Sequence, residues 1–407
     1  MPGTGPVGGR STPATPGSAV AKQHYHSLDA LRAAMMLLGL YLHTVMSYGT
    51  IGAWPWKPAA LTGSLNFSLL LIHVFRMPVF FLLAGFFAAL LVRSRALRQA
   101  AENRLRRILV PLLVSWAAIF PLVAALTALA TVGWNPTSLA AAFSAFLGHA
   151  RPLHLWFLEY LLLLYVSAAV AIPSTAILPV RLRAALNRLF RTAVQSRSGP
   201  ALFALPSFAA LLPMRFVGFD DPSSFVPAPR IVLAYAIPFA FGWLLFRNLD
   251  LFDLFRRRAW AYAAASVLVF LIHLGLRQAS PGASAMFFAE RALHSVALWC
   301  FTFALLGLSL RYFDRPDPVW RYLCEASYFL YLAHVPVILG LQLLLDPLAA
   351  PPLAKIPAVL AGTLAILLLT YHYAVRPSFI GAALNGRKHP PARRPGLPLT
   401  PAPGRAR

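Results

Sequence analysis

The sequence predicts an all-α polytopic membrane protein, a bundle of about ten transmembrane helices with both termini cytoplasmic. Of its 407 residues, 59% are hydrophobic and only 12% are charged, whereas about a quarter of a soluble domain is charged. Ten apolar stretches approach the length that crosses a bilayer. The Lys and Arg residues gather in alternate connecting segments, as the positive-inside rule requires of a multi-pass protein.

The ten expected spans occupy the middle of the chain, and the fifth is the weakest because Pro206 and Pro213 interrupt a short segment. Residues 1–26 are rich in Gly, Pro, Ser and Thr, so we expect no cleavable signal peptide there. We expect 1–26 and the basic segment 377–407 to be disordered tails around a transmembrane domain at 27–376. The expected spans are 28–48, 67–92, 107–131, 152–173, 200–218, 230–247, 258–277, 290–312, 322–345 and 355–375.

The net charge of +24 follows from this uneven distribution of Lys and Arg. Anionic lipid at the inner surface is the ordinary partner of such clusters, so membrane lipid is the expected partner and nucleic acid is not. Cys300 and Cys324 both fall in apolar spans, where we expect small buried side chains and no disulfide. No spacing of His, Cys, Asp and Glu is typical of a metal site, and we expect no bound cofactor.

The first span contains Arg32 and His43, which are eleven residues apart. Eleven residues bring a helix back to almost the same face, about 16 Å further along. Ionisable groups inside a membrane usually mark a site, so we expect an anion-binding end and a proton-transfer end of one channel. Alternatively, Arg32 extends to the interface and His43 makes a structural hydrogen bond. Imidazole is the side chain best matched to proton transfer near neutral pH.

The second span places His73 and Arg76 on one face, at about the depth of His43. Three polar groups at one depth indicate a shared cavity, in which His73 and Arg76 assist catalysis. The alternative is an interhelical hydrogen-bond cluster with a structural role. Gly85, further along this span, is expected to allow close packing between helices.

Arg104 and Arg107 lie one turn apart at the start of the third span. Guanidinium groups suit phosphates, so we expect this pair to bind a phosphorylated cytosolic donor at the cytoplasmic mouth. The alternative is that they only flank the span.

Three further residues are expected to support the site. His154 and Glu159 lie at the outer start of the fourth span, and His334 lies near the middle of the ninth. Glu159 needs a partner inside the membrane, such as Arg76 or a histidine. A purely structural role is the alternative for each.

At these residues the sequence resembles the integral-membrane acyltransferase-3 family over roughly residues 26–376. The first span carries the most specific part of the resemblance. In the second span, Ala84 occupies the position where many members have Ser. In the fourth span, many members have two Glu residues, and this sequence offers only Glu159. The matching segments are His26-Ser-Leu-Asp29-Ala-Leu-Arg32 with His43, Val79-Phe-Phe…Ala84-Gly85-Phe, Arg104…Arg107-Ile…Pro111, Leu155-Trp156-Phe-Leu and Ser327-Tyr328…Tyr331-Leu-Ala-His334-Val-Pro336.

The resemblance implies an O-acyltransferase of the bacterial inner (cell) membrane. It implies that His43 is the catalytic base, that Arg32 is its partner on the same helix and that Arg104 and Arg107 contact an acyl-CoA donor. Members transfer acetyl or succinyl groups to periplasmic or other extracytoplasmic glycans, or acetylate small molecules. A multispanning transporter or flippase is the alternative, in which Arg and His would form a substrate or proton path. A membrane scaffold would leave the buried charges unexplained.

Overall fold

The computed structural model describes residues 25–94, 97–177, 179–222, 224–279 and 284–385. These residues form helices joined by loops, and the predicted all-α membrane fold is confirmed. Nine helices in the described part are long and apolar enough to cross a membrane. They are α2 (His26–Met46), α3 (Asn66–Ser94), α4 (Leu97–Val132), α6 (Trp156–Ile177), α9 (Pro229–Phe246), α10 (Phe252–Ala279), α11 (Ser284–Tyr312), α12 (Pro318–Leu345) and α13 (Pro352–Thr370).

The expected span at 200–218 differs from the other nine. Its helix, α8 (Gly199–Leu211), has 13 residues, which is about 20 Å of helix against a hydrocarbon core of about 30 Å. The helix ends at Leu211, two residues before Pro213, which has no backbone N–H to continue the helical hydrogen bonds. Nine of the ten expected spans are therefore candidate spans in the described residues, and the tenth is a short apolar helix.

Three further helices were not expected. They are α5 (Pro136–Leu147), α7 (Val180–Gln195) and α14 (Phe379–Asn385). In α7 the apolar side chains of Phe190 and Val194 are buried, whereas Arg181 and Arg188 are exposed, as in a helix at a surface.

The expected tails fall largely on residues that the structure does not describe. Residues 1–24 and 386–407 lie outside the described residues. The helix α14 occupies 379–385, inside the segment 377–407 that was expected to be a tail.

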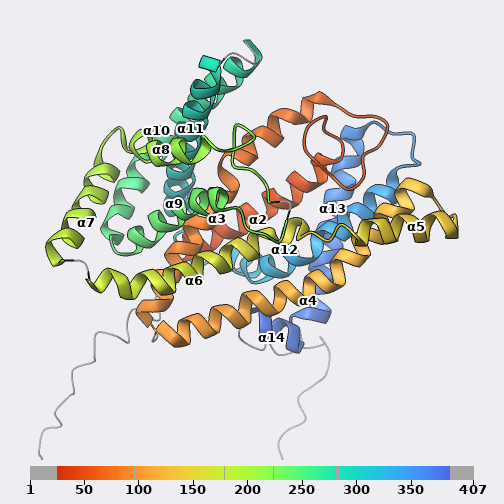
Figure 1. The fold of residues 1–407 in the computed structure, drawn as a ribbon, viewed down its shortest axis with the longest axis horizontal. Helices are drawn as coiled ribbons and strands as arrows, with labels where there is room; N and C mark the ends of the chain where they lie inside the picture. Colours follow the sequence, from red (N-terminus) through yellow and green to blue (C-terminus); the bar gives the residue numbers. More distant parts are fainter. Residues whose placement is uncertain (1–24, 95–96, 178, 223, 280–283, 386–407) are drawn as a thin grey trace, which may run out of the picture.

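Two packed helices, α2 and α12, lie at the centre of the bundle (Figure 1) and contact each other extensively. They are almost 300 residues apart in sequence, and α2 also contacts α3, α11 and α13. Because α2 carries both Arg32 and His43, this arrangement surrounds the two expected site residues with other helices.

The helices α3 and α9 approach each other closely at two glycines. A Cβ atom at Gly85 would overlap the backbone carbonyl of Phe239, and one at Gly242 would overlap that of Leu82. Only glycine allows backbones to come this near. The predicted close-packing role of Gly85 is confirmed, and this contact fixes the helix that carries Arg76.

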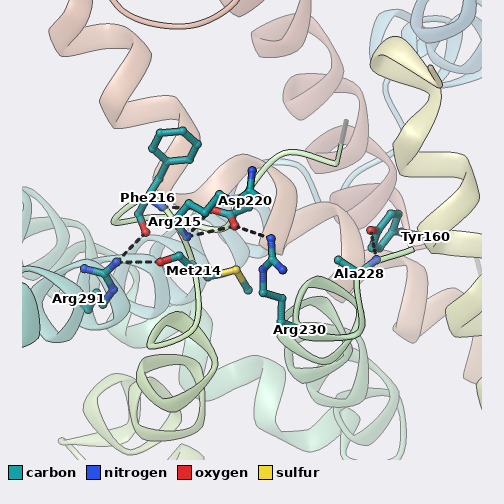
Figure 2. A network of polar contacts seen from close by, with 8 residues as sticks. All are labelled: Tyr160, Met214, Arg215, Phe216, Asp220, Ala228, Arg230 and Arg291. Carbon is teal, nitrogen blue, oxygen red and sulfur yellow. Dashed lines mark hydrogen bonds and ion pairs between the residues drawn. The ribbon is translucent and has the colours of Figure 1, made fainter. Parts of the chain in front are cut away.

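The segment after α8 is held by a buried carboxylate. Asp220 is only 4% exposed and accepts hydrogen bonds from the backbone N–H groups of Arg215 (3.0 Å) and Phe216 (3.1 Å). Figure 2 shows this network, in which the guanidinium of Arg230 also reaches Asp220 at 3.3 Å. The carboxylate thus ties the segment to the start of α9.

A buried arginine holds the same segment from the other side. Arg291 of α11 donates to the backbone carbonyls of Leu211 (3.1 Å), Met214 (3.0 Å) and Phe216 (3.3 Å). Leu211 is the last residue of α8, where carbonyls lack intrahelical partners, and Met214 and Phe216 lie beyond the helix. The guanidinium therefore ties the end of α8 to the segment that follows it, and Figure 2 shows its contacts with Met214 and Phe216.

Candidate functional site

Three histidines from separate parts of the chain meet inside the bundle. His43 comes from α2, His334 from α12 and His154 from the 3-10 turn Leu153–Leu155 before α6. The Nδ1 atom of His43 lies 2.7 Å from Nε2 of His334, and their rings stack with centroids 4.9 Å apart. The ring of His154 is 4.8 Å from that of His334 and 6.5 Å from that of His43. The predicted residues His43, His154 and His334 therefore form one cluster.

The hydrogen bonds of His334 fix the tautomers of the pair. Its Nδ1 faces the carbonyl oxygens of Tyr331 (2.8 Å) and Leu330 (3.1 Å), which can only accept, so Nδ1 carries the proton. In the neutral ring Nε2 then has the lone pair, and His43 must donate to it from Nδ1. It follows that Nε2 of neutral His43 has a lone pair, as a general base needs.

The position of His154 is set by unusual backbone geometry. Leu153 has φ 50°, a left-handed conformation that is strained for a residue with a branched side chain. The Nε2 atom of His154 lies 3.2 Å from the carbonyl of Leu332, and its carbonyl accepts a 2.7 Å hydrogen bond from the hydroxyl of Tyr331. Both contacts are to α12, so His154 ties the start of α6 to the helix of His334.

A tryptophan from the loop between α2 and α3 packs next to His43. The rings of His43 and Trp54 are 5.5 Å apart. The indole N–H donates to the side-chain oxygen of Gln342 at 2.8 Å, and Gln342 in turn donates to the carbonyl of Thr44 at 3.0 Å. This chain of contacts places Trp54 directly against the imidazole.

Arg76 is a buried charge next to this cluster. Its side chain crosses to α2 at Gly39, where a Cβ atom would lie 2.5 Å from Nη2, and Gly39 is one helical turn before His43. The guanidinium lies 5.8 Å above the Phe80 ring. Among the described residues its Nε has no hydrogen-bond partner, and Arg76 is 7% exposed. No ion pair of Arg76 occurs in the described residues, and a buried cation without a counter-ion is costly.

A cavity of about 1020 Å³ opens beside the histidine cluster. Its lining includes Arg32, Arg104 and Arg107, together with apolar side chains deeper inside. The guanidinium of Arg104 lies 5.2 Å above the Tyr165 ring, and its Nε is buried without a hydrogen-bond partner in the described part of the chain. The structure thus brings the predicted anion-binding arginines to one cavity.

Arg32 has contacts that were not expected. Its Nη2 donates to Sγ of Cys324 at 2.7 Å and lies 3.2 Å from the carboxylate of Asp29. Cys324 lines the cavity and is half-buried, so the expectation of a small buried side chain was wrong for this residue. Cys300 is buried as expected.

Phe80 and Tyr331 separate the cavity from the histidines. Both side chains line the cavity. The guanidinium of Arg76 lies over the Phe80 ring, and the Tyr331 ring lies 6.2 Å from the ring of His334. The cavity is lined by Arg32 but not by His43. The expectation of one continuous channel lined by both residues is therefore not met in this structure.

Two predicted residues stand apart from the cluster. His73 is exposed, and its Nδ1 donates to the carbonyl of Leu69 in its own helix at 2.8 Å. Glu159 is half-buried, and in the described residues its Oε2 is buried without a partner. The expected ion pair of Glu159 with Arg76 or a histidine is absent from the described residues.

Sequence reasoning did not identify Trp54, Gln342 or the role of Tyr331. Trp54 lies in a loop, and Gln342 and Tyr331 lie on the same helix as His334. The spacing of Tyr331 three residues before His334 was visible, but its contact with His154 depends on how α6 meets α12.

Comparison with known proteins gives one family and a group of relatives. A family model described as an acyltransferase domain matches residues 25–372. Glucans biosynthesis protein C of Salmonella typhimurium is 25% identical over 93% of this chain and 98% of its own length. Its counterpart from Salmonella typhi is 25% identical over 92% of this chain and 98% of its own length. No solved structure matches.

Proposed function

This chain belongs to the acyltransferase family, and we propose that it transfers an acyl group, succinyl or acetyl, from cytosolic acyl-CoA to a hydroxyl of a periplasmic or other extracytoplasmic glycan. The protein spans a membrane several times, and we propose the bacterial inner membrane as its location. The names of its relatives support a glycan acceptor. The observation that carries the proposal is the His43–His334 pair, which leaves an imidazole nitrogen with a lone pair behind Phe80 and Tyr331, the side chains that line the near end of an arginine-lined cavity.

The cavity suits the donor. Coenzyme A carries several phosphates, and Arg32, Arg104 and Arg107 supply guanidinium groups from two helices that can bind phosphates by paired hydrogen bonds. Part of the charge on Arg32 is already balanced by Asp29, so Arg104 and Arg107 carry most of the phosphate contact. Acyl-CoA is consumed here as a substrate, and the reaction needs no bound cofactor.

The tautomers of His43 and His334 determine which nitrogen acts as the base in the acyl transfer. Nε2 of His43 takes the proton of an acceptor hydroxyl as the oxygen attacks the thioester carbonyl, so that a new C–O bond forms. The imidazolium that results is held by its Nδ1–H bond to His334. The C–S bond then breaks, and the leaving thiolate takes the proton from His43. The products are an ester of the glycan and free coenzyme A.

Arg76 is placed to stabilise the charge that forms on the thioester oxygen. It lies over Phe80, which lines the inner end of the cavity, and against Gly39, one turn from His43. A fixed cation in a dry site requires little reorganisation when the oxyanion forms. For the thioester to reach it, the side chains of Phe80 and Tyr331 must open the inner end of the cavity.

The proposal is tested with the purified full chain in detergent micelles, supplied with acyl-CoA and an acceptor glucan. We expect the release of free coenzyme A, measured by a thiol reagent, to accompany the formation of ester groups on the glucan, measured by mass spectrometry. A transporter or flippase consumes no thioester. Passage of glycan or acyl group across a vesicle membrane with no release of coenzyme A would contradict the acyltransferase proposal and support a transporter or flippase.

A further inference from the structure

The mouth of the arginine-lined cavity contains aromatic and basic side chains that phosphate binding by Arg104 and Arg107 does not use. Phe313 and Arg315 come from the short connection between α11 and α12, and Trp320 comes from the first turn of α12. All three line the cavity. The rings of Phe313 and Trp320 meet edge to face with centroids 5.0 Å apart, which holds the indole in place at the opening.

We propose that this mouth, formed by Phe313, Arg315 and Trp320, binds the adenine nucleotide end of the donor. The purine stacks on the indole of Trp320, and the phosphate on the ribose lies beside Arg315. This inference rests on the proposed acyl-CoA donor, and it specifies which end of that donor the chain recognises and with which residues.

The length of the cavity supports this assignment. Trp320, Cys324, Tyr328 and Tyr331 all belong to α12 and all line the cavity, so this helix forms one wall of it from mouth to inner end. Tyr331 lies eleven residues after Trp320, which corresponds to about 16 Å of helix. A donor whose thioester lies near Tyr331 must therefore extend its other end to the mouth, past the arginines.

The charge at the mouth also favours a nucleotide. Asp317 lies there, but its carboxylate accepts the backbone N–H of Trp320 at 2.9 Å and caps α12. Glu325 is paired with Arg321 at 3.4 Å and with Arg376 at 3.8 Å. Arg315 is exposed, and no ion pair of Arg315 occurs in the described residues. Its guanidinium is thus available for a phosphate.

Aromatic side chains also gather at membrane interfaces without binding any ligand. Trp260 provides the matched comparison, because it is 59% exposed and its indole N–H donates to the Tyr312 hydroxyl at 3.0 Å, yet it does not line the cavity. If Trp320 served only the interface, replacing either tryptophan would have the same effect.

The test compares two donors, acyl-CoA and the matching acyl-phosphopantetheine, which lacks the adenosine nucleotide. For Trp320→Ala we expect the KM for acyl-CoA to rise about tenfold or more, since a base stacked on an aromatic ring contributes that much to binding. The KM for acyl-phosphopantetheine should stay unchanged. Trp320→Phe should retain most of the affinity for acyl-CoA, and Trp260→Ala should leave both KM values unchanged.

A second readout separates this inference from the proposed function. Binding of adenosine 3′,5′-bisphosphate to the full chain, measured by calorimetry, should be weakened by Trp320→Ala and by Arg315→Gln, whether or not acyl transfer is observed. Equal KM changes for both donors in Trp320→Ala would overturn the nucleotide site. So would wild-type protein that uses acyl-CoA but does not bind the bisphosphate, and in that case the proposed acyl transfer would still stand.

Discussion

The imidazoles of His43 and His334 are joined by a contact of 2.7 Å between Nδ1 of the first and Nε2 of the second. Because Nδ1 of His334 donates to backbone carbonyls, this contact directs the lone pair of His43 to Nε2. The arrangement resembles the part of a hydrolase triad in which a third group orients the catalytic imidazole. In this protein a second histidine, His334, orients the imidazole of His43.

The first prediction concerns this orientation. His334→Ala should lower kcat by about 100-fold or more, because His43 loses the acceptor that fixes its tautomer, while the KM for the donor stays unchanged. His334→Gln should recover part of the rate, since its side-chain oxygen can still accept. Steady-state kinetics of coenzyme A release would measure this. A loss of the same size in both variants would contradict the role of an acceptor.

Arg76 gives the second prediction. If its guanidinium stabilises the oxyanion, Arg76→Met should lower kcat by about 100-fold or more, and equally for succinyl and acetyl donors. The ratio of kcat/KM for the two donors measures this directly. A loss confined to the succinyl donor would instead assign the guanidinium to the carboxylate of the acyl group.

The third prediction concerns the donor phosphates. The double variant Arg104→Ala and Arg107→Ala should raise the KM for acyl-CoA by about tenfold or more, because each hydrogen bond between charged groups contributes about 1.5–3 kcal/mol, with a smaller change in kcat. Arg181→Ala with Arg183→Ala is the control, since these arginines are exposed on α7 and do not line the cavity. An unchanged KM in the first double variant would remove the pair from the donor site.

A fourth prediction tests the packing that positions Arg76. Gly85→Ala introduces a methyl group where the carbonyl of Phe239 lies, so α3 and α9 must move apart, at a cost of about 1–3 kcal/mol or more. A lower thermal unfolding midpoint in detergent would show this. Gly275→Ala in α10 is the control, because nothing lies within 4 Å of the added methyl group. That variant should unfold at or above the wild-type temperature.

The sequence predicts the fold well where apolar segments are long and uninterrupted. Nine of the expected spans correspond to long apolar helices in the described residues. The exception is α8, because the hydropathy of a segment does not report how far its helix continues when prolines interrupt it. Arg291 shows another limit, since its contact with the end of α8 depends on two helices meeting and leaves no trace in local composition.

The candidate site was predictable only in part, because several of its contacts join residues that are far apart in the sequence. Helical periodicity places Arg32 and His43 on one helix face, and the structure turns both towards other helices. The pairing of His43 with His334, and of Arg32 with Cys324, joins residues about 290 positions apart. No local pattern encodes such a contact, because it is created when α2 packs against α12.

The most direct test of the account is the rate of coenzyme A release by His43→Ala, in protein that is present in the membrane at the wild-type level. Removing a general base costs about 10²–10⁴-fold in rate, and we predict a loss of this size with little change in the KM for acyl-CoA. His149→Ala, a change at an exposed histidine after α5, should retain the wild-type rate. Wild-type release of coenzyme A by His43→Ala would contradict the central claim that this imidazole is the catalytic base.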